Sequence, residues 1–405
     1  MPDDGVTSAG AGEPRRRHPS ASRGPRLRRR RNRIMWVAHA VTAAMHAPLL
    51  LGATLLVGTA WAFVVCAAFA AATAIRLQRI LSEGRKSRAW TVFVDMPVFV
   101  HWSASLLSTF VLFPLALLLS FAVRASLGWG GGAFHVVAVA GLWSYAVAFV
   151  VAAYGSTLRR RWVHVAHVEV PIAGLSPALD GYRIAQMSDL HIGNFDTKRR
   201  GLEWVERVNR LEPDLVAVTG DLVTTGSAFY EDVADVIAAV RAPDGVFVSM
   251  GNHDQWDPDL LERGIASRGP VVLRNRWRAV RRGDATLVVA GVDDRMTGQD
   301  DLDATLEGRP ERAPTVLLAH YPDFFDDAVR HGVDLVLSGH THGGQIAVPF
   351  LARRASLSTL VRQTRHGLHV NGASRLYVNA GLGTTGPPFR LGVAPEITVF
   401  VLRAV

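Results

Sequence analysis

The sequence predicts a membrane-anchored α/β protein, in which apolar helices precede a layered domain of alternating strands and helices. Two observations predict the helices: the mean hydropathy over 405 residues is +0.17, and Met35 to Ile75 is a run of 41 residues without a charge. A third observation predicts the domain, because short β-rich runs alternate with helical stretches from Tyr182 onward. A chain of this length also favours two or more structural units over one.

The first segment, residues 1–33, is a basic arm. It holds ten Arg against three carboxylates, a net charge of +7, and it is rich in Pro, Gly and Ser. Such a segment cannot bury enough apolar surface to offset its conformational entropy, so we expect it to be disordered. Residues 34–155 contribute +4 and residues 156–405 contribute −2 to the formal net charge of +9. The α/β domain therefore has no basic surplus, which argues against nucleic acid as a partner.

Residues 34–155 are expected to form a transmembrane helical region of about four spans. Because a span needs roughly 20 apolar residues, the uncharged run fits two helices, with a turn near Gly52 to Gly58. Two more apolar stretches follow at Thr91–Val123, whose best span is Trp102–Val123, and at Phe134–Tyr154. Buried core helices of a soluble protein are the alternative, but uncharged runs of this length argue against them.

Loop charges predict the orientation of these helices. Basic residues precede the first helix, fill the loop at 76–91 and follow the last helix as Arg159 to Arg161, whereas the two other turns hold only Arg124. The positive-inside rule then places the N-terminus and everything after residue 158 in the cytoplasm, in a multi-pass protein of the cell membrane. The Arg-rich leader could instead be an export signal, but the apolar run is about twice the length of a signal core and lacks an evident cleavage site.

Several polar residues fall inside the apolar region. Its histidines could form a metal site or a proton path, or they could serve helix packing, which we favour because Asp95 is the one carboxylate in these stretches. Asp95 also lies near the start of a span, where a charge costs less than at the bilayer centre. The single cysteine, Cys66, excludes a disulfide framework and a Cys-based zinc site. The histidines are His39, His46, His101 and His135.

The rest of the chain divides into a linker with a first strand, residues 156–180, and an α/β domain, residues 181–405. Helices are expected at Lys198–Leu211 and Glu231–Val240. The expected strands are Arg183–Met187, Leu215–Val218, Val246–Met250, Leu287–Ala290, Val316–Ala319, Leu335–Leu337, Leu376–Val378 and Ile397–Leu402.

Polar residues follow five of these strands. Ligand sites in open α/β sheets lie beyond the carboxyl ends of the strands, so we expect these residues to gather there. Each motif alone has a plain structural explanation, such as a turn or a helix cap, but five in this order at strand ends indicate one site. They are Asp189 with His191, Gly220-Asp221, Gly251-Asn252-His253-Asp254, His320, and Gly339-His340-Thr341-His342.

The residue types favour two divalent metal ions. Carboxylate oxygens and imidazole nitrogens without thiolates suit Mn, Fe, Zn or Co better than Ca. Asp189 and His191 are two residues apart, so both can face one side of an extended strand end, as can His340 and His342. The set is large enough for two ions with Asp221 between them. Two ions about 3.5–4 Å apart can clamp the attacking and leaving oxygens of a displacement at phosphorus.

At these residues the sequence resembles the calcineurin-like metallophosphoesterase family. The family pattern D-x-H, G-D, G-N-H-D/E, a His and G-H-x-H is complete between Asp189 and His342. The Gly-Gly-Gln after His342, the segment Gly381–Gly386 and the tail Pro395-Glu396-Ile397 are similar to a bacterial branch with membrane-anchored members. The resemblance implies a four-layer α/β/β/α sandwich that hydrolyses a phosphate ester or pyrophosphate with a metal-bridging hydroxide.

Carried over by position, the resemblance implies a role for each residue of the site. His253 would protonate the leaving group or stabilise its charge, with Asp254 orienting the His253 ring. One metal would be bound by Asp189, His191, Asp221 and His342, and the other by Asp221, Asn252, His320 and His340.

The sequence says less about the substrate. Phosphomonoesters, phosphodiesters and pyrophosphates all suit such a site, and the anchor favours a phosphorylated small molecule or lipid near the bilayer. Ile346–Ser374 mixes apolar residues with arginines, which suits a specificity cap for an anionic amphiphile and equally a solvated loop packed against the bilayer. The alternative is a non-catalytic membrane-anchored binding module with a phosphoesterase fold, which the complete motifs argue against. The oligomeric state stays open.

A further set of basic residues has no motif around it. We expect these residues at the surface or in linkers, with His366, His369 and Arg390 as the ones that could reach the site. The others are His164, His167 and His331.

Overall fold

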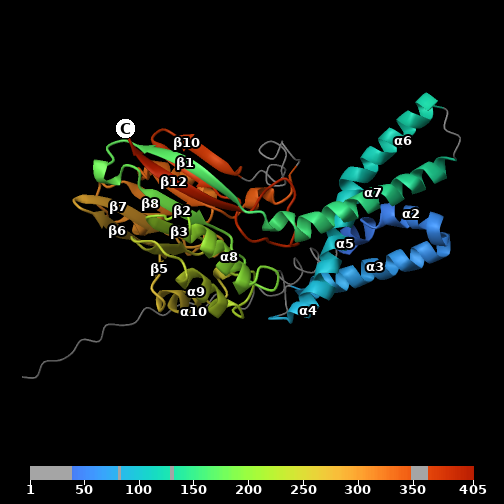
Figure 1. The fold of residues 1–405 in the computed structure, drawn as a ribbon, viewed down its shortest axis with the longest axis horizontal. Coiled ribbons are helices and arrows are strands. Elements are labelled where there is room, and N and C mark those ends of the chain that lie inside the picture. Colours follow the sequence, from blue (N-terminus) through green and yellow to red (C-terminus); the bar gives the residue numbers. More distant parts are fainter. Residues whose placement is uncertain (1–38, 81–83, 128–131, 348–363) are drawn as a thin grey trace, which may run out of the picture.

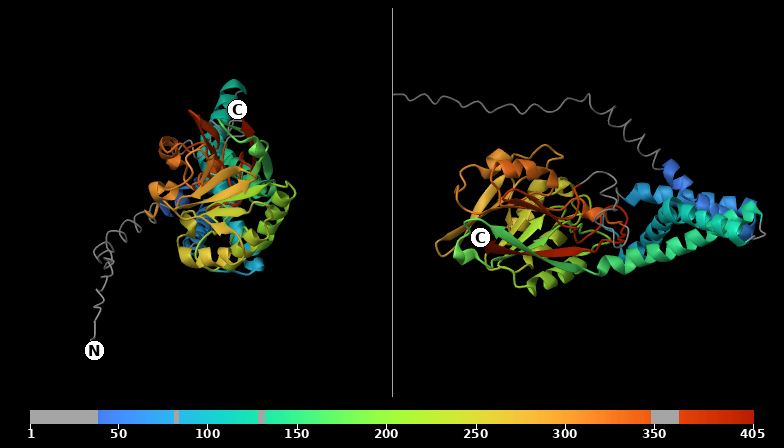
Figure 2. Two further views of the ribbon diagram at one scale, coloured as in Figure 1. Left: turned by 90° about the vertical axis from the view of Figure 1, so that its left-hand side faces the viewer. Right: turned by 90° about the horizontal axis from the view of Figure 1, so that it is seen from above.

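The computed structural model of the chain describes residues 39–80, 84–127, 132–347 and 364–405. The expected basic arm at 1–33 and most of the expected cap lie outside these residues. Figure 1 shows a bundle of helices, α2 to α7, beside an α/β part that holds the remaining elements, and Figure 2 shows the same two parts from the side and from above.

Four helices of the described chain are long and apolar enough to cross a membrane: His39–Val57, Thr59–Arg79, Arg88–Ser126 and Ala133–Arg161. The expected turn of the first pair falls at Gly58, whose φ of 78° is left-handed and unstrained for glycine. Their labelled segments are α2 (Ala47–Val57), α3 (Thr59–Ile80), α4 (Arg88–Trp90), α5 (Met96–Leu107), α6 (Phe113–Leu127) and α7 (Ala133–Thr157).

The third of these helices runs well beyond the span expected from the sequence. Two π-helical segments, Thr91–Asp95 and Ser108–Leu112, join α4, α5 and α6 into one continuous helix. Because a π turn keeps the backbone hydrogen-bonded, the extra residue per turn is absorbed without breaking the helix. Asp95 is buried at its start and pairs with Arg76 at 2.6 Å and Lys86 at 3.0 Å, so its charge is compensated by one residue of α3 and one of the segment before α4.

Close packing and buried polar contacts hold the bundle together. A Cβ on Gly52 of α2 would lie 2.5 Å from the Leu142 nitrogen of α7. The backbones of these two helices are therefore so close that only a residue as small as glycine fits between them. His46 Nε2 lies 2.9 Å from His101 Nε2, and His101 Nδ1 lies 2.6 Å from the Tyr145 hydroxyl. Both histidines are buried between helices, in agreement with the packing interpretation.

Two six-stranded sheets form the centre of the α/β part. The strand order is β1-β12-β2-β3-β4-β5 in the first sheet and β10-β11-β9-β8-β7-β6 in the second. Strands β2 to β5 are parallel to one another, as are β7, β8, β9 and β11. The bounds are β1 (His164–Ile172), β2 (Arg183–Met187), β3 (Leu215–Thr219), β4 (Val246–Ser249), β5 (Val271–Val272), β6 (Arg276–Arg282), β7 (Ala285–Gly291), β8 (Thr315–Leu318), β9 (Leu335–Ser338), β10 (Gly367–Asn371), β11 (Ser374–Val378) and β12 (Glu396–Ala404).

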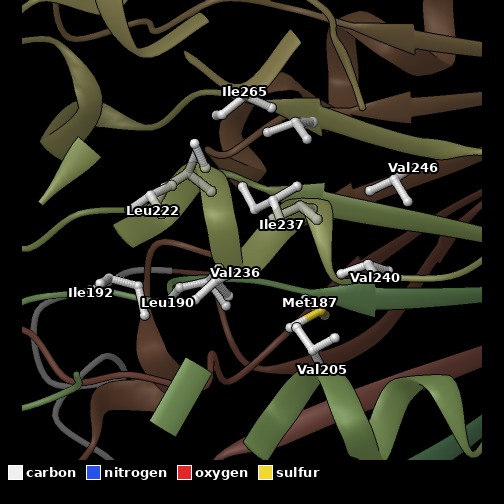
Figure 3. Close-up of a cluster of buried hydrophobic side chains, with 14 of the residues drawn as sticks. Met187, Leu190, Ile192, Val205, Leu222, Val236, Ile237, Val240, Val246 and Ile265 are labelled. Carbon is white, nitrogen blue, oxygen red and sulfur yellow. The ribbon is translucent and has the colours of Figure 1, made fainter. Parts of the chain in front are cut away.

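Three clusters of buried apolar side chains pack the layers of the α/β part against one another. The first lies between the first sheet and its covering helices (Figure 3), the second lies between the two sheets, and the third lies under the helices of the second sheet. This arrangement confirms the expected four-layer α/β/β/α sandwich. The helices are α8 (Lys198–Asn209), α9 (Tyr230–Ala238) and α10 (Pro258–Ala266) on the first sheet, and α11 (Leu302–Leu306) and α12 (Phe325–Arg330) on the second.

Loops beyond the carboxyl ends of the strands contact the helical bundle. Phe389, in the loop after β11, is buried in a cluster with Ala104 of α5 and Ala148 of α7. Arg160, just after α7, pairs with Asp196 at 2.5 Å, and both side chains are buried. The sheet edge that carries the predicted site therefore faces the membrane-type helices.

Candidate metal centre

Six of the seven residues predicted to bind metal form two clusters that share Asp221. The ligand atoms of the first cluster, and likewise those of the second, all lie within 4.8 Å of one another. Asp221 follows β3, at the middle of the parallel strands of the first sheet, so it can face groups from both sheets. The first cluster contains Asp189, His191, Asp221 and His342, and the second contains Asp221, His320 and His340.

Asn252, the seventh predicted residue, lies directly after β4. Its Oδ1 accepts a hydrogen bond from the Tyr321 hydroxyl at 3.1 Å. The Tyr321 ring in turn lies against His340, with 4.2 Å between ring centroids. Asn252 is therefore linked to the second cluster through Tyr321.

The backbone is strained at most of these residues. In the described chain, eight non-glycine residues have a left-handed backbone, and five of them belong to the two clusters. Such a conformation costs about 1–3 kcal/mol per residue and persists where surrounding structure enforces it, commonly at functional sites. The five, with φ between 45° and 65°, are Asp189, His191, Asp221, His340 and His342.

Glycines in the motifs make room for the carboxylates. A Cβ on Gly251 would lie 2.3 Å from Asp221 Oδ1, and a Cβ on Gly339 would lie 2.2 Å from Asp189 Oδ2. Since real Cβ atoms do not approach oxygen so closely, each position requires glycine. The G-N-H-D and G-H-x-H motifs thus contain glycine because a carboxylate of the candidate clusters packs against that backbone.

The imidazole nitrogens are arranged to accept a cation. His320 Nδ1 donates to the Thr219 carbonyl at 2.8 Å, which leaves a lone pair on Nε2. That Nε2 is buried without a hydrogen bond and lies 3.3 Å from Asp221 Oδ2. In the first cluster, Nε2 of His191 lies 3.0 Å from Nε2 of His342 and 3.5 Å from Asp221 Oδ2. Imidazole nitrogens that face one another beside carboxylates fit divalent cations.

Burial controls the protonation of the histidines. It lowers the pKa of His191 to about 3 and that of His340 to about 4, and holds the pKa of His342 well below its usual range. Burial also lowers the pKa of His320, but the Asp221 carboxylate more than offsets this and raises that pKa to about 10. His320 and Asp221 could hold a divalent cation together, which would offset the Asp221 charge in place of a proton and leave His320 neutral.

Burial also acts on the carboxylates. It raises the pKa of Asp189 to about 6, and the nearby charge of Asp221 contributes to the increase. The Ser188 hydroxyl donates to Asp189 Oδ2 at 2.6 Å, and the backbone N–H of His340 donates to Asp189 Oδ1 at 3.1 Å. The second interaction joins the β2 end of the first sheet to the β9 end of the second.

His253 lies beside the first cluster, and its ring is held by a backbone carbonyl. Its Nδ1 donates to the Thr224 carbonyl at 2.5 Å, and its ring lies edge-on to His191 with 4.8 Å between centroids. Among the described residues no hydrogen bond joins the Asp254 carboxylate to the His253 ring, and the orienting role of Asp254 stays a prediction. The fully buried Asp254 carboxylate accepts instead from backbone amides of Leu222, Val223 and Gly251. It holds the β3 loop against the β4 loop, because a buried carboxylate is satisfied best by converging N–H groups.

Comparison with known proteins agrees with this geometry. A sequence model of the calcineurin-like phosphoesterase family matches residues 182–344. The "uncharacterized metallophosphoesterase YkuE" of Bacillus subtilis is 32% identical over 230 residues, which cover 56% of this chain and 80% of that protein. The chain belongs to the calcineurin-like metallophosphoesterase family. It is thus a metal-dependent phosphoesterase, and its buried His/Asp clusters are suited to divalent metal ions.

Other relatives of this metallophosphoesterase extend the comparison to proteins named for a membrane region. The "transmembrane protein with metallophosphoesterase domain" of Danio rerio is 32% identical over 269 residues, covering 63% of this chain and 60% of that protein. The protein of the same name from Bos taurus is 32% identical over 258 residues, covering 59% of this chain and 57% of that one. The metallophosphoesterase described here is likewise a membrane protein by its four apolar helices.

The phosphoesterase places Arg390 in its interior, which corrects the expected surface position. Arg390 is fully buried, and its guanidinium donates to the carbonyl oxygens of Ala380, Gly381 and Gly383 at 2.6–3.0 Å. Converging carbonyl dipoles of the loop after β11 solvate its charge. Arg390 therefore fixes this loop behind His342 and does not face a phosphate.

The remaining basic residues without motifs lie outside both clusters. His366 Nε2 pairs with Glu396 Oε2 at 2.8 Å, and His369, in β10, is half-buried and bonds to the Arg365 carbonyl at 2.7 Å. His331 pairs with Asp303 at 3.0 Å, while His164 and His167 belong to β1.

Three functional contacts were not anticipated from the sequence: the Ser188 hydroxyl, the Thr224 carbonyl and the Tyr321 hydroxyl. Ser188 and Tyr321 are each adjacent to a predicted ligand, and this adjacency is the only signal the sequence offers. Thr224 acts through its backbone, which no residue type reveals.

Proposed function

We propose that this metallophosphoesterase binds two divalent metal ions and hydrolyses a phosphate ester or pyrophosphate at the membrane surface. The observation that supports it most is the shared position of Asp221, which belongs to both ligand clusters. Two ions held there would polarise the phosphoryl oxygens and lower the pKa of a shared water. The ions would be Mn, Fe, Zn or Co.

In this proposal each residue has a defined task. His253 protonates the leaving group or stabilises its developing charge through Nε2, because Nδ1 is engaged by the Thr224 carbonyl. Tyr321 orients Asn252 through its hydrogen bond to Oδ1. The first ion would be bound by Asp189, His191, Asp221 and His342, and the second by Asp221, Asn252, His320 and His340.

The position of the site favours substrates near the bilayer, including lipid-linked phosphates. The loop that begins two residues after His191 contacts the segment before α4: Asn194 Oδ1 accepts from the Lys86 backbone at 2.9 Å, and Asn194 Nδ2 donates to the Gly84 carbonyl at 3.1 Å. A site at this edge is close to the ends of the membrane spans, so a substrate anchored in the leaflet can reach it without leaving the membrane.

The same contacts support a cytoplasmic catalytic domain. Gly84 and Lys86 contact Asn194 of the α/β part, and Arg85 adds an ion pair to Asp232 at 2.8 Å, so residues 84–86 lie at the end of the bundle next to the α/β part. Basic residues flank the spans at both places, in the segment before α4 and directly after α7. The positive-inside rule therefore assigns this end of the bundle, and the α/β part beside it, to the cytoplasm. We divide the chain accordingly into an arm at 1–33, membrane helices at 34–155, a linker with β1 at 156–180 and the phosphoesterase domain at 181–405. A reporter fused after Val405 would test the orientation, and access by external reagents alone would contradict it.

A substrate panel tests the activity. The full chain, stripped of metal by a chelator, is supplied with each candidate ion and with para-nitrophenyl phosphate, its bis-ester and a lipid-linked pyrophosphate. We expect hydrolysis that requires added metal and that is lost in His340→Ala. The control His369→Ala should keep it, since His369 lies in β10 and belongs to neither cluster. Metal binding without hydrolysis of any substrate would favour the non-catalytic binding module.

A further inference from the structure

A cavity of about 510 Å³ lies between the helical bundle and the α/β part. Its walls come from the segment 85–96 at the start of the third span, from residues 160–163 after α7, and from residues 193–207, which include α8. None of the residues predicted to bind metal lines it. Figure 1 shows α4 at the end of the bundle that lies towards α8 and α9. The cavity is thus a junction between membrane and enzyme, separate from the metal centre.

The junction cavity is strongly basic. Nine Lys or Arg side chains line it against two carboxylates, Glu203 and Asp232. Some of the cations are compensated, as Arg85 is by Asp232. Arg88 and Arg161 have no carboxylate partner among the described residues, nor has Arg207. The volume falls in the range of small-molecule sites, about 300–1,000 Å³. A cavity of this size with three uncompensated positive charges is suited to an anion.

The position of the junction cavity narrows the choice of anion. Arg88 is the first residue of one candidate span, and Arg161 is the last residue of another. Large exposed aromatic side chains flank these two arginines: Trp90 is 46% exposed, Phe93 78% and Trp162 58%. Aromatic residues at span ends sit at the level of the lipid headgroups. The cavity therefore opens where phospholipid phosphates lie.

We propose that the junction cavity binds the phosphate headgroup of an anionic phospholipid, held by Arg88, Arg161 and Arg207. Val92 and Met96, which also line the cavity, provide apolar contact on the side of the bundle. Arg88 belongs to α4, Arg161 to the turn after α7, and Arg207 to α8. A bound headgroup would therefore connect these three elements. This proposal rests on the bilayer placement of the helices and is independent of the reaction and its substrate.

Native mass spectrometry of the full chain in detergent tests the proposal. Phosphatidylglycerol and phosphatidylcholine are added separately, and retained lipid is identified by its mass. The test variant is Arg88→Gln/Arg161→Gln/Arg207→Gln. The matched control is Arg79→Gln/Arg159→Gln/Arg210→Gln, which removes three charges from the same regions outside the cavity. Thermal melting checks that both variants fold.

We expect the wild type and the control to retain phosphatidylglycerol in preference to phosphatidylcholine. The test variant should retain about tenfold less phosphatidylglycerol, since each basic residue near the surface contributes to anionic lipid binding. Equal retention by all three proteins, or equal retention of both lipids by the wild type, would overturn the proposal. So would displacement of the phosphatidylglycerol by inorganic phosphate, because the cavity would then recognise free phosphate and not a lipid.

Discussion

His253 is the residue that most clearly separates catalysis from metal binding. Its ring is half-buried, is held by the Thr224 carbonyl, and belongs to neither ligand cluster. The ligand histidines are mostly buried and have nitrogens facing carboxylates or one another. In the proposed reaction the two kinds of histidine have separate tasks, because a nitrogen that binds metal cannot carry the proton that the leaving group takes up.

Replacing His253 should therefore lower turnover without emptying the site. We expect His253→Ala to reduce kcat by about 10²–10⁴-fold, the usual contribution of a general acid, while metal content stays close to that of the wild type. Steady-state kinetics with a para-nitrophenyl ester and elemental analysis of the same preparation measure the two quantities. His369→Ala serves as the control. If His253→Ala also loses its metal, the residue is a ligand or a structural support.

The strand-to-loop junctions are the elements that build the site. Five residues of the two clusters leave their strands in a left-handed conformation, and glycines beside them let neighbouring loops touch. Asp254 fastens the β3 loop to the β4 loop through three backbone amides. The strain of the ligands is tolerated because buried parallel strands and these loop contacts leave the backbone no alternative.

A methyl group at one such junction should disable the site without unfolding the domain. In Gly251→Ala the new Cβ would overlap Asp221 Oδ1, displacing the carboxylate that both clusters share. We expect metal content and activity to fall together, while the circular dichroism spectrum is retained. Gly264→Ala in α10 is the matched control, because the nearest atom to its Cβ is 3.9 Å away. Full metal content in Gly251→Ala would show that the loop relaxes and that the close contact is not required.

The sequence predicts most of these elements because their signals are local. The buried parallel strands are apolar runs, and the ligands follow them within a few residues. Strand β6 was not predicted because four of its seven residues are Arg, which an edge strand tolerates. The roles of Asp254 and Arg390 depend on backbone amides and carbonyls brought together only by the fold. Residue type alone indicates a charged side chain at each position and says nothing of its burial.

At the scale of the whole molecule, a buried ion-pair network joins the membrane bundle to the enzyme. Asp196, in the loop after β2, pairs with Arg160 at 2.5 Å and Arg200 at 3.1 Å, and it accepts from the Thr384 hydroxyl at 3.1 Å. Burial alone would raise the pKa of Asp196, but the two arginines more than offset this and lower it. Asp196 therefore contributes stability above its unfolded pKa of about 3.9, and this contribution is lost as pH falls through the lower folded value.

Removing Asp196 should destabilise the full chain. Asp196→Ala leaves Arg160 and Arg200 buried without a counter-charge, which costs about 3–5 kcal/mol. Thermal unfolding in detergent measures the loss as a lower melting temperature at neutral pH, and the difference from the wild type should shrink below about pH 4. Asp303→Ala is the control, since Asp303 is 89% exposed and its loss should change stability by no more than about 0.5 kcal/mol. A difference that is the same at all pH values would contradict the ionic origin of the effect.

The proposed dinuclear site depends on one buried carboxylate, that of Asp221, which would bind both ions. The direct measurement is the metal content of the full chain, compared between the wild type and Asp221→Asn. Each protein is loaded with Mn²⁺ and desalted, and its bound manganese is measured by elemental mass spectrometry. We predict about two ions per wild-type chain. In Asp221→Asn we predict loss of metal from both positions, because the neutral amide lacks the negative charge of the carboxylate that both clusters share. A wild type with a single ion, or an Asp221→Asn variant with the full wild-type content, would contradict the dinuclear site.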